Sequence, residues 1–217
     1  MHISQFIGAV GYRIGNLLAP LRCACCDTPL DQRALLCQAC AATVIRWDGD
    51  HNPMALGLYG GALASTVLRL KYGKRPDIGT ALGELLCSVV LSNITEPRID
   101  VVVPVPTPYS RLSERGYNQA ALIAKPVASA LSARFEPRAL ARRDGSIKQA
   151  ALGRNDRLTN LHGAFSLRDR RSIADRRVLL VDDVSTTGAT LNSCRKVLSD
   201  GGARCVHAVV VARTDNT

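Results

Sequence analysis

The stretch Val178-Leu-Leu-Val-Asp182-Asp183-Val-Ser185-Thr186-Thr187-Gly188-Ala-Thr190 decides the fold class of this chain of 217 residues. It begins with an apolar run of the kind that is buried on both faces of a parallel sheet. Two carboxylates follow, and a loop rich in hydroxyl groups then leads into a helical pattern over residues 189–198. The stretch therefore predicts a buried strand, a polar loop and a helix in direct succession.

The loop has the properties of a phosphate site. The first N–H groups of a helix have no intrahelical partners, and the helix dipole favours a negative charge beside them. The hydroxyls of Ser185, Thr186, Thr187 and Thr190 add neutral donors, and Gly188 lets the backbone come close to a ligand. An anion such as phosphate is therefore the expected occupant of the loop.

The two carboxylates before the loop need a different occupant. Asp182 and Asp183 repel phosphate, and they suit either the hydroxyl pair of a sugar or a magnesium ion with its waters. Together the acids and the loop predict a phosphorylated sugar that carries a diol. Two alternatives remain at this point: a magnesium-binding strand end of another α/β fold, and an ordinary capped helix.

Further apolar runs at residues 54–59, 99–103 and 206–211 predict three more strands. Helical patterns at residues 63–72, 77–91 and 119–133 lie between them. Strands that alternate with helices form parallel βαβ units. We therefore expect an α/β domain over residues 51–217, with a Rossmann-like parallel sheet flanked by helices. The polar, arginine-rich residues 142–160 predict a loop and a short helix.

Residues 1–50 predict a separate small lobe. A helical pattern at residues 4–18 ends at Pro20, and two Cys-x-x-Cys pairs separated by ten residues follow it. Four thiolates at this spacing suit a structural, tetrahedral zinc site of the zinc-ribbon kind, with Cys23, Cys26, Cys37 and Cys40 as ligands. Redox chemistry and an iron-sulfur cluster are the alternatives, and the neighbouring Cys25 leaves the choice of ligands open.

The overall charge predicts anionic partners. The formal net charge is +10 and the sequence pI is about 9.6, which favours phosphates or nucleic acid.

The N-terminus has no Lys/Arg-rich start of the kind a secretory signal has, and Arg13 interrupts its apolar stretch. Because no apolar run reaches the roughly 18 residues of a membrane span, we expect a cytoplasmic protein.

Residues 178–190 resemble the type I phosphoribosyltransferases, whose motif for phosphoribosyl pyrophosphate (PRPP) is an apolar strand, two acids and a Thr-Thr-Gly-x-Thr loop. In that family the acids bind the ribose 2- and 3-hydroxyls and the loop holds the 5-phosphate, with magnesium as the accompanying ion. The resemblance implies that Asp182 and Asp183 are catalytic, and that the PRPP loop consists of Ser185, Thr186, Thr187, Gly188, Ala189 and Thr190.

A wider resemblance covers the chain from about residue 23 to its end. Val103-Pro104-Val105-Pro106 precedes Arg115-Gly116-Tyr117-Asn118-Gln119, and Gly163-Ala164-Phe165 precedes the PRPP motif. With the two cysteine pairs, this order resembles the ComF family of competence-associated and gluconate-associated proteins, which place a zinc knuckle before a phosphoribosyltransferase-like domain. The resemblance implies partners in DNA uptake, namely single-stranded DNA and competence proteins.

The same resemblance gives roles to three basic residues. Arg111 and Arg115 are expected to hold the pyrophosphate, and Lys71 is expected to contact PRPP. For Arg111, a surface ion pair with Glu114 is the alternative. For Lys71 the alternative is simple solvation.

Residues 134–177 contain twelve basic and five acidic residues, and this excess of seven has three possible explanations. Arg142, Arg143, Lys148 and Arg154 belong either to a lid that closes over PRPP or to a surface for single-stranded DNA, and a solvated basic face is the third possibility.

The sequence thus predicts a PRPP- and magnesium-binding protein linked to DNA uptake, which transfers the phosphoribosyl group to an unidentified acceptor. The alternative is a regulatory or single-stranded-DNA-binding competence protein that reuses the fold without catalysis.

Overall fold

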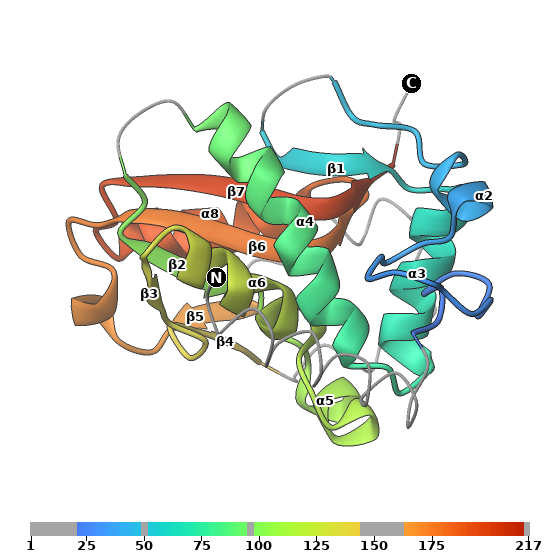
Figure 1. Cartoon of the computed structure of the whole chain (residues 1–217). Coiled ribbons are helices and arrows are strands. Elements are labelled where there is room, and N and C mark those ends of the chain that lie inside the picture. The colour runs from blue at the N-terminus through green and yellow to red at the C-terminus, as the bar shows by residue number, and fades with distance from the viewer. Residues whose placement is uncertain (1–20, 49–51, 95–97, 144–162, 215–217) are drawn as a thin grey trace, which may run out of the picture.

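The computed structural model describes residues 21–48, 52–94, 98–143 and 163–214 (Figure 1). Its elements in chain order are α2 (Gln38–Ala41), β1 (Met54–Leu58), α3 (Gly61–Tyr72), α4 (Asp77–Asn93), β2 (Val101–Pro104), α5 (Tyr109–Arg115), α6 (Gln119–Ala130), β3 (Arg134–Phe135), β4 (Leu140–Arg142), β5 (Phe165–Leu167), the 3-10 helix η2 (Arg170–Ser172), β6 (Arg177–Ser185), α8 (Ala189–Asp200) and β7 (Cys205–Arg213).

Five strands form a parallel sheet in the order β1-β7-β6-β2-β3. The central strand β6 pairs with β7 from Arg177↔Cys205 to Ser185↔Arg213, and with β2 from Val101↔Val178 to Pro104↔Val181. Because the strands are parallel, all their first residues lie along one edge and all their last residues along the other. We call these the amino edge and the carboxyl edge of the sheet.

The strand side chains alternate between two cores. Val102, Leu179 and Val181 pack with residues of α4 and α6 on one face, which is the nearer face in Figure 1. On the other face, Val101 and Leu180 pack with residues of α8. All five are fully buried. This burial on both faces explains why the strands are continuous apolar runs.

Two glycines of α4 allow α6 to lie very close to it. A Cβ at Gly83 would lie 2.3 Å from the carbonyl oxygen of Ile123 and 2.4 Å from Cγ of Pro126. A Cβ at Gly79 would lie 2.6 Å from Cβ of Leu122. The close approach of these helices seals the core beneath them.

The predicted α/β class with a parallel sheet is confirmed, and the differences are local. The predicted strand at 178–181 is longer, so that both acids belong to β6. Helix α5, strand β3 and the antiparallel pair β4-β5 were not predicted. The predicted helix at 4–18 and most of the arginine-rich loop lie outside the described residues. Within the described ranges, no helix has the length and apolar character needed to cross a membrane.

Candidate functional site

The acid pair lies at the carboxyl edge, near the end of β6. Asp182 and Asp183 are 8% and 4% exposed, and the backbone N–H of Asp183 donates a 2.8 Å hydrogen bond to Oδ1 of Asp182. Buried carboxylates are uncommon unless they are paired or bind a ligand. The position matches the general rule that open α/β sheets bind ligands at the carboxyl ends of their strands.

Lys71, in the last turn of α3, reaches this acid pair. Its Nζ lies 3.1 Å from Oδ2 of Asp183, and its side chain is 22% exposed. Oδ2 of Asp183 is buried and accepts no hydrogen bond among the described residues, so the contact with Lys71 is an ion pair without hydrogen-bond geometry. This carboxylate oxygen therefore retains the capacity to accept a hydrogen bond or to bind a cation.

The surroundings of Asp182 disfavour its ionised form. Burial, assisted by the charge of Asp183, raises the pKa of Asp182 to about 8, although Lys71 and Arg142 oppose the rise. At neutral pH Asp182 consequently holds its proton.

The predicted phosphate loop connects β6 to α8. Ser185 is buried and Thr186 and Thr187 are exposed. Gly188, the N-cap of α8, has φ 74°, a left-handed conformation that favours glycine. The loop is held by Thr214, whose N–H donates to the Ser185 carbonyl at 3.0 Å and whose hydroxyl donates to the Thr186 carbonyl at 3.2 Å.

The first turn of α8, which includes Ala189 and Thr190, contains no acidic residue. The N–H groups at this helix start therefore have no neighbouring carboxylate on their own helix. A helix of twelve residues preceded by a hydroxyl-rich loop can accept a phosphate in this position.

The two predicted pyrophosphate residues both belong to α5, which follows β2 at the same carboxyl edge. Arg111 pairs with Glu114 at 3.0 Å, and both side chains are more than half exposed. Arg115 donates a 3.0 Å hydrogen bond to Gln119, and its guanidinium lies 5.0 Å from the ring centre of Tyr72. Arg115 is thus held in place by protein contacts, whereas within the described ranges Arg111 has only its surface pair.

The turn between β2 and α6 is braced by side-chain hydrogen bonds. Asn118 caps α6 by accepting from the Ala120 N–H at 3.0 Å, and its amide donates to the Val105 carbonyl at 3.0 Å. The hydroxyl of Thr107 donates to Asn118 at 2.9 Å. Tyr117 connects this turn to α3 through a 2.6 Å hydrogen bond from its hydroxyl to the Leu70 carbonyl.

The residues predicted for a lid or for DNA contact are only partly described. Arg142 ends β4, and its guanidinium lies 5.3 Å from the ring centre of Phe165. Its charge lowers the pKa of Asp182, against the larger effects of burial and of Asp183. Arg143 follows it, and its N–H bonds to the Ala164 carbonyl at 2.9 Å. Lys148 and Arg154 lie outside the described residues.

The four predicted zinc ligands are brought together. The sulfurs of Cys23, Cys26, Cys37 and Cys40 all lie within 4.8 Å of one another, and Sγ of Cys26 and Sγ of Cys37 are 3.7 Å apart. Zinc–sulfur bonds of about 2.3 Å in a tetrahedron require sulfurs about 3.8 Å apart. The donor set therefore fits zinc, and the sulfur of Cys25 is not part of this group of four.

Local contacts favour the thiolate form that a metal needs at Cys23 and Cys26, whereas a contact with the Cys25 thiol and burial raise the pKa of Cys40. A hydrogen bond with the Thr28 hydroxyl lowers the pKa of Cys26 to about 6. The backbone N–H of Cys37 lies 3.3 Å from Sγ of Cys23, as a donor to sulfur. N–H groups directed at sulfur stabilise negative charge on a cysteine ligand.

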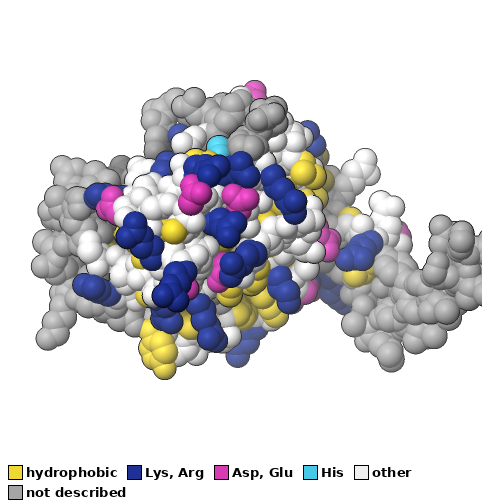
Figure 2. Space-filling view, turned by 90° about the vertical axis from the view of Figure 1, so that its left-hand side faces the viewer, with side chains coloured by type: hydrophobic (Ala, Val, Ile, Leu, Met, Phe, Trp, Pro, Cys, Tyr) yellow, Lys and Arg dark blue, Asp and Glu magenta, His cyan; other side chains and the backbone are white. Residues whose placement is uncertain are grey.

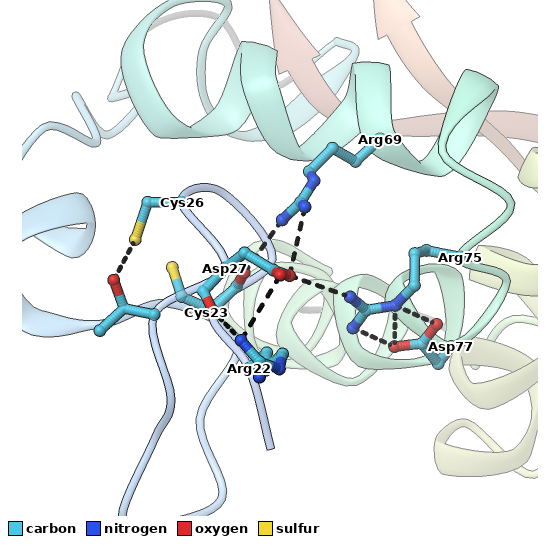
Figure 3. Close-up of polar contacts among 8 residues, drawn as sticks. Arg22, Cys23, Cys26, Asp27, Arg69, Arg75 and Asp77 are labelled. Atoms are coloured by element: carbon cyan, nitrogen blue, oxygen red, sulfur yellow. Dashed lines mark hydrogen bonds and ion pairs between the residues drawn. The ribbon is translucent and has the colours of Figure 1, made fainter. Parts of the chain in front are cut away.

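The four-cysteine lobe is attached to α3 and to the connection between α3 and α4 through Asp27, a contact that sequence reasoning missed (Figure 3). The Asp27 carboxylate contacts guanidinium nitrogens of Arg69 at 3.2 Å, Arg22 at 3.6 Å and Arg75 at 3.7 Å. Arg69 also donates to the Cys23 carbonyl at 3.3 Å, and Arg75 pairs with Asp77 at 2.7 Å. The only signal for this network in the sequence was Asp27 directly after Cys26, which identified no partner.

Comparison with known proteins gives consistent results. A family model described as "Phosphoribosyl transferase domain" matches residues 118–217. Competence protein F of Haemophilus influenzae is 31% identical over 195 residues, which cover 88% of this chain and 84% of that protein. DNA utilization protein YhgH of Escherichia coli K12 is 29% identical over 197 residues, with the same coverage. An adenine phosphoribosyltransferase of Mycobacterium tuberculosis is 35% identical over 89 residues, 39% of this chain and 41% of that protein.

Among solved structures, one described as the allosteric regulatory enzyme of purine biosynthesis aligns with a TM-score of 0.46 at 21% identity. The alignment covers 66% of this chain and 29% of the other.

Proposed function

The chain belongs to the ComF family of phosphoribosyltransferase-like proteins, and from that premise we propose that it binds PRPP together with magnesium and transfers the phosphoribosyl group to an acceptor. The observation that carries the proposal is the buried acid pair on the central strand, directly before the hydroxyl-rich loop that leads into α8. A helix cap alone does not need either carboxylate, and a structural ion pair alone does not need the loop.

Each part of the site has a place in this function. The N–H groups at the start of α8 and the hydroxyls of Thr186 and Thr187 hold the 5-phosphate. Asp182 and Asp183 accept hydrogen bonds from the ribose 2- and 3-hydroxyls. Arg115, already oriented by Gln119 and Tyr72, binds the pyrophosphate, and Arg111 can leave its surface pair to do the same.

Lys71 and Asp182 supply the charge balance. The lysine forms an ion pair with Asp183, and the raised pKa of Asp182 keeps that buried carboxyl neutral at neutral pH. Magnesium, when bound, neutralises part of the pyrophosphate charge. The transfer breaks the bond between the ribose anomeric carbon and a pyrophosphate oxygen, which takes the electron pair, and the acceptor's nucleophilic atom forms the new bond to that carbon.

Binding is tested first, by calorimetry and thermal unfolding with PRPP and magnesium. We expect heat of binding and a higher melting temperature for the wild type, and loss of both in Asp182→Asn/Asp183→Asn. Asp200→Asn is the matched control, because that exposed acid pairs only with Lys196 on the surface of α8. Absence of binding by the wild type would overturn the proposal. Pyrophosphate release over a panel of amines and nucleobases then tests transfer.

We propose zinc for the four-cysteine lobe, because four thiolates within 4.8 Å leave no position for a catalytic water and suit a structural role. Metal analysis of the purified chain, with one zinc per molecule expected, is the test.

The second candidate function is DNA handling without transfer chemistry. The names of the two relatives, DNA utilization protein and Competence protein F, support it, as does the net charge of +10. The two candidates are separable, since a chain that binds DNA and PRPP but releases no pyrophosphate with any acceptor would favour the second.

A further inference from the structure

Arginines lie side by side along the amino edge of the sheet, opposite the acid pair. Arg134 begins β3, Arg176 precedes β6 and Arg204 precedes β7. Backbone hydrogen bonds connect them across the edge: Arg134 N–H to the Asp100 carbonyl at 3.0 Å, Asp100 N–H to the Arg177 carbonyl at 2.9 Å, and Arg204 N–H to the Arg176 carbonyl at 2.9 Å. The row therefore has arginines at three of four neighbouring strand starts, and Asp100, which pairs with Arg177 at 3.2 Å, occupies the position before β2.

The row continues onto the segments beside it. Arg138 and Arg168 flank the paired residues Leu140↔Leu167, and the N–H of Arg168 bonds to the Ala139 carbonyl at 2.8 Å, which places the two arginines at the same end of the β4-β5 pair. Arg171 lies in η2. We define the amino-edge arginine face by six exposed residues, which are Arg134, Arg138, Arg168, Arg171, Arg176 and Arg204.

Most of these guanidinium groups are not neutralised by the protein. Arg134 pairs with Glu136, and Arg204 pairs with Asp175. The other four have neither a hydrogen bond nor an ion pair from the guanidinium to any part of the chain that the structure describes. Residues 163–177 alone contain five arginines and two aspartates. Figure 2 looks onto this edge and shows dark-blue side chains spread over its middle, with fewer magenta ones among them.

The arrangement suits a linear polyanion. Neighbouring strands are about 4.8 Å apart, so that the row from β3 to β7 extends over about 14 Å. This length accommodates a short run of consecutive phosphates along one strand of nucleic acid. Guanidinium groups bind phosphates in a bidentate manner, and groups without an internal partner lose no existing pair when they do so.

The face reads phosphates and not bases. The exposed tyrosines of the described residues are Tyr59, Tyr72 and Tyr109, which follow β1, end α3 and begin α5, away from the strand starts. None of these exposed tyrosines lies at the amino edge, so they cannot stack on bases of a strand bound there. Binding there depends on charge, with strong salt dependence and little sequence preference.

We infer that the amino-edge arginine face binds the phosphate backbone of single-stranded DNA, at a surface separate from the PRPP site. The inference deepens the DNA-handling candidate by naming its surface, and it uses none of the residues Arg142, Arg143, Lys148 and Arg154 that were expected from the sequence. It does not depend on phosphoribosyl transfer.

The test measures binding of a labelled oligothymidylate to the full chain between about 50 and 200 mM salt. For Arg138→Ala/Arg168→Ala/Arg171→Ala/Arg176→Ala we expect at least tenfold weaker binding, and a salt slope that is smaller by about 3, since each lost contact to a single-strand phosphate removes about 0.7. The control Arg33→Ala/Arg46→Ala/Lys74→Ala/Lys196→Ala removes the same charge from other exposed positions and retains most of the affinity.

Several outcomes would overturn the inference. An equal loss in the control variant would show a net-charge effect, and a loss in Arg142→Ala/Arg143→Ala with none in the quadruple variant would place DNA at the carboxyl edge. Binding to anionic lipid vesicles but not to the oligonucleotide would identify a different partner, and tighter binding of duplex than of single strands would identify a different form of nucleic acid. Unchanged oligonucleotide binding by Asp182→Asn/Asp183→Asn is expected, so failure of the PRPP proposal would leave this result intact.

Discussion

Lys71 and Asp183 form an ion pair in which Nζ and Oδ2 are 3.1 Å apart, and the carboxylate is almost completely buried. The lysine belongs to α3. The residue before it, Leu70, accepts the hydrogen bond of the Tyr117 hydroxyl through its carbonyl, and Arg69 of the same helix contacts the four-cysteine lobe. The last turn of α3 thus contacts the acid pair, the β2-α6 turn and the cysteine lobe at once.

The first prediction concerns this pair. Lys71→Met leaves the Asp183 carboxylate buried without a cation, and should lower the free energy of unfolding by about 2 kcal/mol, less than the roughly 3–5 kcal/mol for a fully buried pair because the lysine is partly exposed. Urea unfolding measures the change. Lys71→Met/Asp183→Asn should recover most of it, and equal stability of Lys71→Met and wild type would contradict the prediction.

The second prediction is a pH dependence. The pKa of Asp182 is about 8 in the folded chain and about 3.9 in an unfolded one, so between these values the folded state binds the extra proton. Stability should therefore fall as pH rises from about 4 to 8, by at most about 1.4 kcal/mol per pH unit. Unfolding at several pH values measures the slope, which Asp182→Asn should flatten. Parallel curves for the two chains would contradict the assignment.

Two other acids titrate at lower pH. Arg75 lowers the pKa of Asp77, and the Arg177 N–H lowers the pKa of Asp100, so both change stability only in more acidic solution.

The third prediction separates the cysteines. Cys37→Ser should lose the zinc and lower the melting temperature, because four thiolates are needed to complete the tetrahedron. Cys25→Ser is the matched control and should retain one zinc per chain, because its sulfur is outside the group of four. Elemental analysis and native mass spectrometry provide the measurement. Zinc loss in Cys25→Ser would show that this cysteine is a ligand.

The fourth prediction concerns the attachment of the lobe. Asp27 has φ 66°, which Asn also adopts readily, so Asp27→Asn removes the charge and preserves the backbone. It should cost about 1 kcal/mol, since three partly exposed pairs contribute a few tenths each. Hydrogen exchange of the amides in residues 23–40 should accelerate. Glu84→Gln, which removes only the 3.4 Å pair with Arg33, should leave that exchange unchanged. Equal rates in both variants would show that Asp27 does not fix the lobe.

The fifth prediction tests the contact between α4 and α6. Gly83→Ala would place a methyl group 2.3 Å from the Ile123 carbonyl oxygen, and should destabilise the fold by about 1–3 kcal/mol. Gly60→Ala is the control, since it has φ −177° and no heavy atom within 4 Å of the new Cβ. Thermal unfolding should show a lower melting temperature only for the first variant, and similar values for both would refute the tight contact.

The sequence was sufficient for the parallel sheet because its main strands are buried on both faces, which leaves continuous apolar runs such as residues 178–181. It was not sufficient for β3 or the β4-β5 pair. Arg134–Phe135 and Leu140–Arg142 are too short to show a period, and they become strands through pairing with distant residues.

The site was predictable in its residue types but not in its electrostatics. The acids and the loop were recognisable from their order along the chain. The proton on Asp182 depends on burial, and the partner of Asp183 comes from another helix, so neither property is local. The excess of basic residues in 134–177 was visible in the sequence, but how these residues are distributed between the two edges of the sheet was not. The strand directions send Arg142 towards the acid pair and Arg134, Arg138 and Arg176 to the opposite edge.

The nine residues of β6 extend for about 30 Å, with Arg177 at one end and Ser185 at the other. At physiological ionic strength the Debye length is about 8 Å, so charge arriving at one end of the strand is screened before it is felt at the other. If both proposed sites bind their ligands, single-stranded DNA and PRPP should therefore occupy one molecule together, with neither displacing the other. Substitutions at one end of β6 are then expected to change the affinity of the site at that end alone.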